Sequence, residues 1–316
     1  MKTAAARPVL CVGLTPAVQE VREFAALEMG GVNRSFTVTH SSAGKGTNVA
    51  HVLKTLGHDP VLTGFIGGAT GTQYAGFVRA LGIRTDFVTT AARTRVCVTL
   101  IERDTGRITE LVEEASLPTP AEWRAFHRKF AARLKRTSLL TLTGALMPGA
   151  PAKLYAQLTH AAEKFAVPVL IDSQKAPLLA ALAHRPLLAK LNVHELENTL
   201  ATQLPRPNAI IAGARDLVAR GAQHVLVTHG EHGAWLVAAN RAIHFASPCV
   251  PVCNPIGSGD AVTAGIAFAL LQSEPMTEAV RLGIACGAAN VMTPTPGTVK
   301  VKDVTRLRRQ VTSRPA

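Results

Sequence analysis

The sequence is poor in cysteine and in long apolar runs, and each shortage excludes a class of protein. Its 316 residues include five scattered cysteines without a Cys-x-x-Cys pair, which argues against a disulfide framework and a structural zinc site. No apolar run reaches the roughly 20 residues that cross a bilayer, and residues 1–8 lack the apolar core of a signal peptide. We therefore expect a cytoplasmic protein with no membrane partner.

Acidic and aromatic residues are also few. Asp and Glu number 21 against 34 Lys and Arg, so the net charge is +13, and aromatic residues make up 4%. That share is too small for base-stacking platforms. The most basic segment, residues 122–136, carries Trp123, Phe126 and Phe130 at helical spacing, which is typical of an amphipathic helix with a solvated basic face. We expect no nucleic-acid partner; a basic surface also suits small anionic substrates.

Short β-branched or apolar runs alternate with helical patterns along most of the chain. This alternation predicts an α/β fold with a doubly wound, mainly parallel sheet flanked by helices. Ligands of such sheets bind beyond the carboxyl ends of the strands. The predicted strands are Val9–Leu14, Val61–Ile66, Leu139–Thr143, Val167–Asp172, Leu188–Asn192 and His224–Thr228. The predicted helices are Lys45–Leu56, Thr72–Leu81, Pro120–Arg136, Pro151–Phe165 and Asn208–Arg220.

Two regions break the alternation. Val32–Thr39 has a strand pattern with polar alternate positions, and Arg95–Glu102 with Arg107–Val112 has the pattern of a hairpin. Because no crossover helix follows either region, we expect a small β-sheet lid that excludes water from the crevice, or else simple edge strands. The chain is predicted to form a single domain over residues 1–316, with lid strands inserted at about 15–42 and 86–115.

A glycine-rich turn near the C-terminal end, Gly257-Ser258-Gly259-Asp260, precedes an apolar helical run. The unpaired amide N–H groups of a helix start converge at its positive end and form a hole suited to a phosphate. A carboxylate at the lip of this hole, that of Asp260, can accept a proton from an attacking hydroxyl. The combination indicates phosphoryl transfer to an alcohol; taken alone, a plain turn remains the alternative.

A second glycine turn, Gly44-Lys45-Gly46-Thr47-Asn48, also opens a helix. It is not a P-loop, because Gly46 occupies the place of the Ser or Thr that holds magnesium. Lys45 offers a mobile cation, and Asn48 both donates and accepts hydrogen bonds. The turn therefore suits a phosphate or a polyol, or it is a helix cap with a solvated lysine.

Two further segments suit phosphate groups. The glycines of Thr228-His229-Gly230-Glu231-His232-Gly233 would let a nucleotide approach the backbone, although a surface loop is the simpler interpretation of its histidines. Arg95 stands at the start of the hairpin, where a guanidinium can bind phosphate through two hydrogen bonds or lie exposed on a strand.

Asn192 and Glu195 lie three residues apart at a strand end, so they can share one face of the following helix. A carboxylate near bound phosphates suits Mg²⁺, which needs few protein ligands. The alternative is that Glu195 belongs to a capping box. The run from His194 to Asn198 is not a zinc-protease helix, because Asn198 stands where the second histidine must be.

In their order along the chain, these segments resemble the PfkB, or ribokinase-like, carbohydrate kinases, with the 1-phosphofructokinase and tagatose-6-phosphate kinase branch as the nearest likeness. The resemblance extends from Val12 to about Val299. The segments that carry it are Thr15-Pro16-Ala17, Ala43-Gly44-Lys45-Gly46-x-Asn48-Val49-Ala50, Gly64-Phe65-Ile66-Gly67, Thr94-Arg95, Thr143-Gly144-x-Leu146-x-Pro148-x-Gly149, Asp172-Ser173, Asn192-x-x-Glu195, Gly230-x-x-Gly233-Ala234 and Gly257-Ser258-Gly259-Asp260.

The resemblance implies an ATP-dependent carbohydrate kinase with a β lid, and it suggests a role for each matching residue. Catalysis is implied for Asp260 as the base and for Gly257, Ser258 and Gly259 as the anion hole. ATP contacts are implied for Asn192, Thr228, Gly230, Gly233 and Asn290. Glu195 is implied in organising Mg²⁺. Acceptor contacts are implied for Gln19, Gly44, Lys45, Asn48, Arg95 and Thr143. The resemblance also allows a monovalent cation near the anion hole and a homodimer through the lid.

The sequence departs from the family pattern mainly on the acceptor side. Gln19 replaces an Asp that binds acceptor hydroxyls, Cys97 replaces an Asn, and Ala145 replaces a Ser; Asn254 replaces the first Asp of the wider signature. We predict phosphorylation of a hexose phosphate, such as fructose 1-phosphate, fructose 6-phosphate or tagatose 6-phosphate, with changed or weak acceptor binding. The alternatives are a catalytically weak sugar-phosphate-binding regulator and a kinase for an unphosphorylated sugar or nucleoside.

Overall fold

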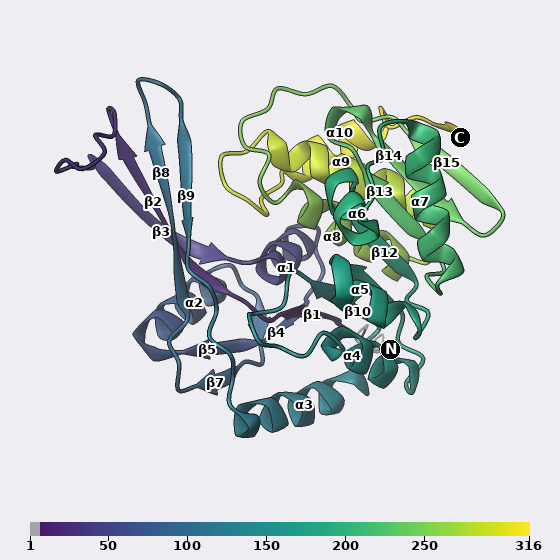
Figure 1. Ribbon diagram of the computed structural model, residues 1–316, viewed down its shortest axis with the longest axis horizontal. Coiled ribbons are helices and arrows are strands. Elements are labelled where there is room, and N and C mark those ends of the chain that lie inside the picture. The colour runs from purple at the N-terminus through teal and green to yellow at the C-terminus, as the bar shows by residue number, and fades with distance from the viewer. Residues whose placement is uncertain (1–6) are drawn as a thin grey trace, which may run out of the picture.

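The computed structural model describes residues 7–316, which are built around one large, mainly parallel sheet (Figure 1). The strand order is β16-β15-β14-β13-β12-β11-β10-β1-β4-β6, and among the described residues the only antiparallel pairs in it are β13–β14, β14–β15 and β15–β16. The bounds are β1 Val9–Gly13, β4 Val61–Thr63, β6 Arg84–Thr85, β10 Leu139–Thr143, β11 Val169–Asp172, β12 Leu188–Asn192, β13 Val225–Thr228, β14 Ala234–Ala238, β15 Arg241–Phe245 and β16 Ser313–Pro315.

Helices cover both faces of this sheet. Alternate residues of β1 point to opposite faces: Val9 and Cys11 pack with α1, α2, α8, α9 and α10, whereas Leu10 and Val12 pack with α3 to α7. The bounds are α1 Lys45–Thr55, α2 Gly68–Ala80, α3 Pro120–Leu134, α4 Leu154–Glu163, α5 Lys175–Leu182, α6 Val193–Leu200, α7 Pro207–Ala219, α8 Ser258–Leu271, α9 Met276–Val291 and α10 Val301–Arg308. The predicted doubly wound α/β fold is confirmed. Within residues 7–316, no helix has the length and apolar character needed to span a membrane.

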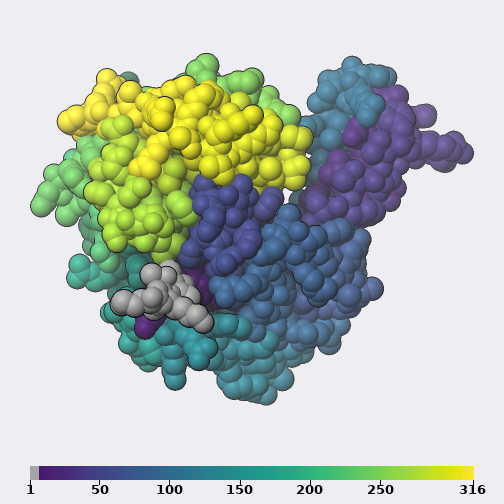
Figure 2. All heavy atoms as spheres, turned by 180° about the vertical axis from the view of Figure 1, so that it is seen from behind, coloured from purple at the N-terminus to yellow at the C-terminus, as the bar shows by residue number. Residues whose placement is uncertain are grey.

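A second, four-stranded sheet stands out from the body of the molecule (Figures 1 and 2). Its order is β3-β2-β8-β9, with β2 Ala17–Phe24, β3 Thr37–Ala43, β8 Arg95–Glu102 and β9 Ile108–Val112. The central pair, β2 and β8, is parallel, and both outer pairs are antiparallel. We call this sheet the lid sheet. A two-stranded sheet of β5 Phe65–Gly67 and β7 Val88–Thr90 lies nearby. The predicted small β-sheet is confirmed.

The structure corrects two strand predictions. The strand predicted at Val32–Thr39 begins only at Thr37, because residues 25–36 form a loop in which Asn33 hydrogen-bonds to the backbone of Glu28. The strand predicted at Val61–Ile66 is divided at Gly64 between β4 and β5, which belong to different sheets. In addition, β2 has no counterpart among the predicted strands.

The turn before β14 gives a stability test with a matched control. Gly233 has a φ of +90°, and an added Cβ would lie 2.0 Å from the Phe245 carbonyl oxygen; Gly57 has a φ of +94° but no neighbour within 4 Å of its Cβ position. Gly57→Ala should lower the free energy of unfolding by about 1–2 kcal/mol through backbone strain. Gly233→Ala should lower it by at least about 3 kcal/mol, because the clash adds to the same strain. Urea unfolding of both variants measures the difference, and equal losses would contradict the close approach.

Candidate active site

The carboxyl ends of the central parallel strands open into a cavity of about 850 Å³. It lies where the strand order reverses, because β1 pairs with β4 on one side and with β10 on the other. Ligands of doubly wound sheets bind at such a switch point. The lid sheet forms one wall, and loops 254–260 and 294–296 form another. All the predicted site residues line this cavity except Gly233 and Asn290.

The predicted anion hole lies at the start of α8. Gly257 precedes the helix with a φ of +80°, and an added Cβ would lie 2.8 Å from the Gly297 backbone nitrogen, so only glycine fits. Within residues 7–316, no protein acceptor faces the backbone N–H groups of Gly259 and Asp260. These donors at the positive end of the helix are therefore available to an anionic ligand.

Asp260 lies in the first turn of α8 and is 4% exposed. Its Oδ2 accepts a hydrogen bond of 2.8 Å from Asn48 Nδ2. Burial, and then the negative charge of Asp172, raise the pKa of Asp260 to about 7, against the opposing effects of Lys45, Asn48 and Lys190. A carboxyl with this pKa is suited to accept a proton near neutral pH.

Asp172, at the end of β11, is 1% exposed and binds two ammonium groups. Lys190 Nζ lies 2.7 Å from its Oδ2, and Lys45 Nζ lies 3.1 Å from its Oδ1. The hydroxyl of Thr263 in α8 also donates to Oδ2, at 3.2 Å. Burial alone would raise the pKa of Asp172, but the charges of Lys190 and Lys45 hold it below its usual range. Asp172 in turn raises the pKa of Lys45. The Asp172 carboxylate and the Lys45 ammonium are therefore charged at neutral pH.

Strand register explains how this charged group forms. Asp172 and Lys190 are directly opposite each other on the parallel strands β11 and β12, so their side chains lie on the same face of the sheet. A Cβ added to Gly259 would lie 3.0 Å from Lys190 Nζ. The Lys190 ammonium therefore lies directly against the helix start that forms the anion hole.

Lys190 and Thr263 are site residues that the sequence analysis missed. Lys190 is 4% exposed within β12, whose neighbouring residues are apolar, and Thr263 lies in the apolar run of α8. A charged residue in the middle of a buried strand requires a partner, and this was the signal available in the sequence. Asp172 and Lys45 were each recognised in a motif, but their ion pair was not predicted.

Glu195 takes part in a capping box and also faces the cleft. Its Oε2 accepts a hydrogen bond of 2.8 Å from the Asn192 backbone, and Asn192 Oδ1 accepts one of 2.8 Å from the Glu195 backbone. The other oxygen, Oε1, lies 3.5 Å from Lys45 Nζ. The capping alternative is therefore present, and Oε1 remains directed toward the cleft.

On the acceptor side, Arg95 is engaged with the backbone at the base of the lid sheet. Its Nε and Nη2 donate to the Thr15 carbonyl at 3.3 and 2.9 Å, and its Nη1 donates to the Glu113 carbonyl at 2.9 Å. Gln19 Nε2 donates to Thr99 Oγ1 at 2.8 Å, and Cys97 lies opposite Gln19 in the strand register. The Arg95 hydrogen bonds link the chain segments that enter and leave the lid sheet, and the Gln19 hydrogen bond links β2 to β8 within it.

Two asparagines hold the loops around the anion hole. Asn290 Nδ2 donates to the Ile256 carbonyl at 2.9 Å, and its Oδ1 accepts from the Thr298 backbone at 3.2 Å. Asn254 Nδ2 donates to the Pro294 carbonyl at 2.8 Å, while its Oδ1 accepts from the Ile256 backbone at 2.9 Å. An aspartate at position 254 could not make the donated bond.

Comparison with known proteins identifies the family and the fold of this chain. Residues 7–302 match the family described as pfkB family carbohydrate kinase. The 1-phosphofructokinase of Bacillus subtilis (strain 168) is 31% identical over 291 residues, covering 92% of this chain and 94% of that protein. The crystal structure of phosphofructokinase-2 from Escherichia coli in complex with potassium superposes with a TM-score of 0.90 at 24% identity, covering 96% of this chain and 99% of that chain.

The structure of Arabidopsis thaliana ribokinase complexed with ribose and ATP shares the fold, with a TM-score of 0.78 at 19% identity over 96% of this chain and 99% of that chain. The chain belongs to the pfkB family of carbohydrate kinases, and its fold is ribokinase-like. It is an ATP-dependent kinase.

The two lysines that bind Asp172 make a matched pair for a stability test. The Lys190 side chain is 5% exposed, whereas that of Lys45 is 40% exposed. Lys190→Met should lower the free energy of unfolding by about 3 kcal/mol, because it weakens the compensation of a buried carboxylate. Lys45→Met should cost at most about 1 kcal/mol, because solvent weakens the interaction of this partly exposed ammonium and Lys190 still compensates the buried carboxylate. Chemical denaturation at pH 7 measures both, and an equal or smaller loss for Lys190→Met would contradict the buried pair.

Proposed function

We propose that this protein transfers the γ-phosphoryl group of ATP to a hydroxyl of a hexose phosphate, with fructose 1-phosphate as the first acceptor to test. The observation that supports this most directly is the combination of Asp260 and the free N–H groups in one helix turn inside the cleft. Fructose 1-phosphate is the first choice because two proteins that are each 31% identical to this chain, from Bacillus subtilis and Escherichia coli, are named 1-phosphofructokinases.

In the proposed mechanism, the acceptor hydroxyl gives its proton to Asp260 as its oxygen attacks the γ-phosphorus. The bond between that phosphorus and the β,γ-bridging oxygen breaks, and ADP leaves with the bonding electron pair. Asn48 holds the carboxylate by its 2.8 Å hydrogen bond. The N–H groups at the start of α8 face the charge that spreads over the transferred phosphoryl oxygens. Lys190 adds positive charge beneath the same turn. ATP lies along the cleft wall that contains Asn192, Thr228 and Gly230.

We also propose that Glu195 and Asn192 hold Mg²⁺ through water. Both residues line the cleft, and Glu195 Oε1 is not used by the capping box. Mg²⁺ retains several of its waters and binds through few carboxylates, so this pair fits. When bound with ATP, the ion neutralises phosphate charge. The potassium in the Escherichia coli structure and the family resemblance support a monovalent cation near the anion hole.

One observation favours a second candidate, a kinase for an unphosphorylated sugar or nucleoside. The cations that line the cleft among the described residues are Lys45, Arg95 and Lys190. Each already pairs with a carboxylate or with backbone carbonyls. Glu110 and Glu114 also line the cavity and would repel an acceptor phosphate.

We propose a homodimer through the lid sheet as the assembly of this protein. Its surface carries exposed apolar side chains, including those of Ile108, Leu111 and Val112, at 58%, 53% and 58% exposure. One structure of phosphofructokinase-2 from Escherichia coli is described as its tetrameric inhibited form, so oligomers occur among proteins of this fold.

A kinetic panel tests the proposed function. ADP release from MgATP is measured with hexose phosphates, hexoses and nucleosides as acceptors. Faster release with a hexose phosphate than with the corresponding hexose supports the first candidate, and the reverse order supports the second. No acceptor-dependent release, together with binding of a sugar phosphate in calorimetry, would instead support the regulator.

The pKa of Asp260 predicts the pH dependence of the reaction. The base is ionised above its pKa of about 7, so kcat/KM should fall as the pH decreases through that value. Asp260→Asn should lower kcat by at least about 100-fold while the Kd for ATP stays within about twofold of wild type, because Asp260 accepts the acceptor proton and does not hold the nucleotide. Unchanged turnover would remove Asp260 from the role of base.

Gln19 offers a test of the changed acceptor side. Gln19→Asp should raise kcat/KM for fructose 1-phosphate by about tenfold, because a hydrogen bond to a charged group is worth about 1.5–3 kcal/mol. Gln19→Asn is the matched control, with the shorter side chain but no charge, and should show no gain. Steady-state kinetics of both variants measure the effect. A loss with Gln19→Asp would indicate that the pocket is built for another acceptor.

A further inference from the structure

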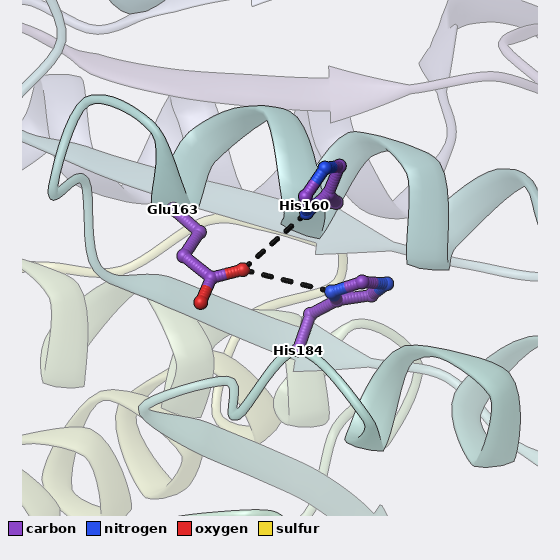
Figure 3. A group of neighbouring side chains, drawn as sticks. All are labelled: His160, Glu163 and His184. Carbon is purple, nitrogen blue, oxygen red and sulfur yellow. Dashed lines mark hydrogen bonds and ion pairs between the residues drawn. The ribbon is translucent and has the colours of Figure 1, made fainter.

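A cluster of side chains able to bind a metal lies away from the catalytic cleft. His160 and Glu163 belong to the last turn of α4, and His184 lies just after α5 (Figure 3). Between parallel strands, each crossover helix runs back from the carboxyl end of one strand to the amino end of the next. The C-terminal ends of α4 and α5 therefore meet near the amino ends of β11 and β12. The cleft lies at the opposite ends of these strands.

The ligand atoms lie close to the separations that a single metal ion requires. Nδ1 of His160 lies 3.4 Å from Glu163 Oε2, and Nδ1 of His184 lies 3.6 Å from the same oxygen. Figure 3 shows both rings directed at this carboxylate. All three ligand atoms lie within 4.8 Å of one another. Two ligands held at about 2.0–2.1 Å in a tetrahedral zinc site lie about 3.3–3.4 Å apart, so small side-chain rotations are sufficient.

The backbone that carries these side chains is held in place. The His184 amide donates to the Ala181 carbonyl at 3.0 Å. The next residues are held by Gln223, whose backbone N–H donates to the Pro186 carbonyl at 3.0 Å and whose side chain donates to the Arg185 carbonyl at 3.0 Å. Ligands on a backbone held in this way lose less conformational entropy when an ion binds.

Charge and access also favour a cation at this cluster. Among residues 7–316, the ion pairs of Glu163 are with the two histidines and not with lysine or arginine. The side chains of His160, Glu163 and His184 are 50%, 59% and 29% exposed. An ion can therefore reach the cluster from solvent, and so can water as a further ligand.

We propose that His160, Glu163 and His184 bind a divalent transition metal, with zinc as the first candidate and water completing the coordination. Two imidazoles and one carboxylate suit Zn²⁺, Co²⁺, Ni²⁺ or Cu²⁺, whereas Mg²⁺ and Ca²⁺ prefer oxygen ligands. The ion joins the end of α4 to the turn after α5. It stabilises the fold away from the cleft, and it does not depend on the proposed kinase reaction.

Calorimetric titration of the full chain, stripped of metal and free of nucleotide, with zinc chloride tests this proposal. The wild type should bind one zinc ion at this cluster and gain thermal stability on binding. His160→Ala, Glu163→Gln and His184→Ala should each weaken this binding by more than about tenfold and abolish the gain in Tm. These side chains are exposed enough that the metal-free variants should unfold at nearly the wild-type temperature.

His194→Ala is the matched control. His194 pairs with Glu197 three residues on, at 4.0 Å, but it belongs to no group of three ligands among the described residues. This variant should keep the zinc affinity. Because Cys249 and Cys253 are exposed, a titration with cobalt identifies the ligands: absence of a thiolate-to-cobalt absorption band supports the histidine site. Equal zinc affinity in the wild type and in all three ligand variants would overturn the proposal. Displacement of bound zinc by an equal concentration of magnesium would also overturn it.

Discussion

The buried carboxylate of Asp172 is the interaction around which the catalytic cleft is organised. It draws together Lys190 from β12, Lys45 from α1 and Thr263 from α8. A buried carboxylate without partners costs free energy of folding. The fold is therefore most stable when β12, α1 and α8 bring their side chains into contact with Asp172. The remaining negative potential of Asp172 raises the pKa of Asp260. The Asp172 carboxylate thus helps to position the walls of the cleft and helps to raise the pKa of the proposed base, Asp260.

Several polar groups of the cleft serve the fold and the site together. Glu195 closes the start of α6 with one oxygen and faces the cleft with the other. Arg95 uses its donors on the backbone where the chain enters and leaves the lid sheet. Arg95 therefore restrains the lid sheet, and this contact competes with its predicted role as a ligand for an acceptor phosphate. The acceptor pocket consequently has fewer free cations than its residue types suggested.

The core of the fold was predictable from the sequence because its strands are short apolar runs between helical patterns. Strands β8, β10 and β12 have the predicted bounds. Strand β2 was missed because Gln19, Glu20, Val21 and Arg22 show no simple apolar alternation and pair only with distant segments. The anion-hole turn was visible as a local motif. The partners of Asp172 and Arg95 were not, because those contacts depend on strand register and on residues far away in the chain. The individual site roles and the cytoplasmic location stay predictions.

The central claim is that the charge of Asp172, together with burial, raises the proton affinity of Asp260. The pH dependence of kcat/KM for Asp172→Asn, compared with wild type on the same acceptor, tests it most directly. The substitution removes a negative charge and leaves Lys45 and Lys190 uncompensated, and both changes lower the pKa of Asp260. The account predicts that, in Asp172→Asn, the fall of kcat/KM on the acidic side of the pH profile (the acidic limb) moves to lower pH. A limb that stays in place or moves to higher pH would contradict it.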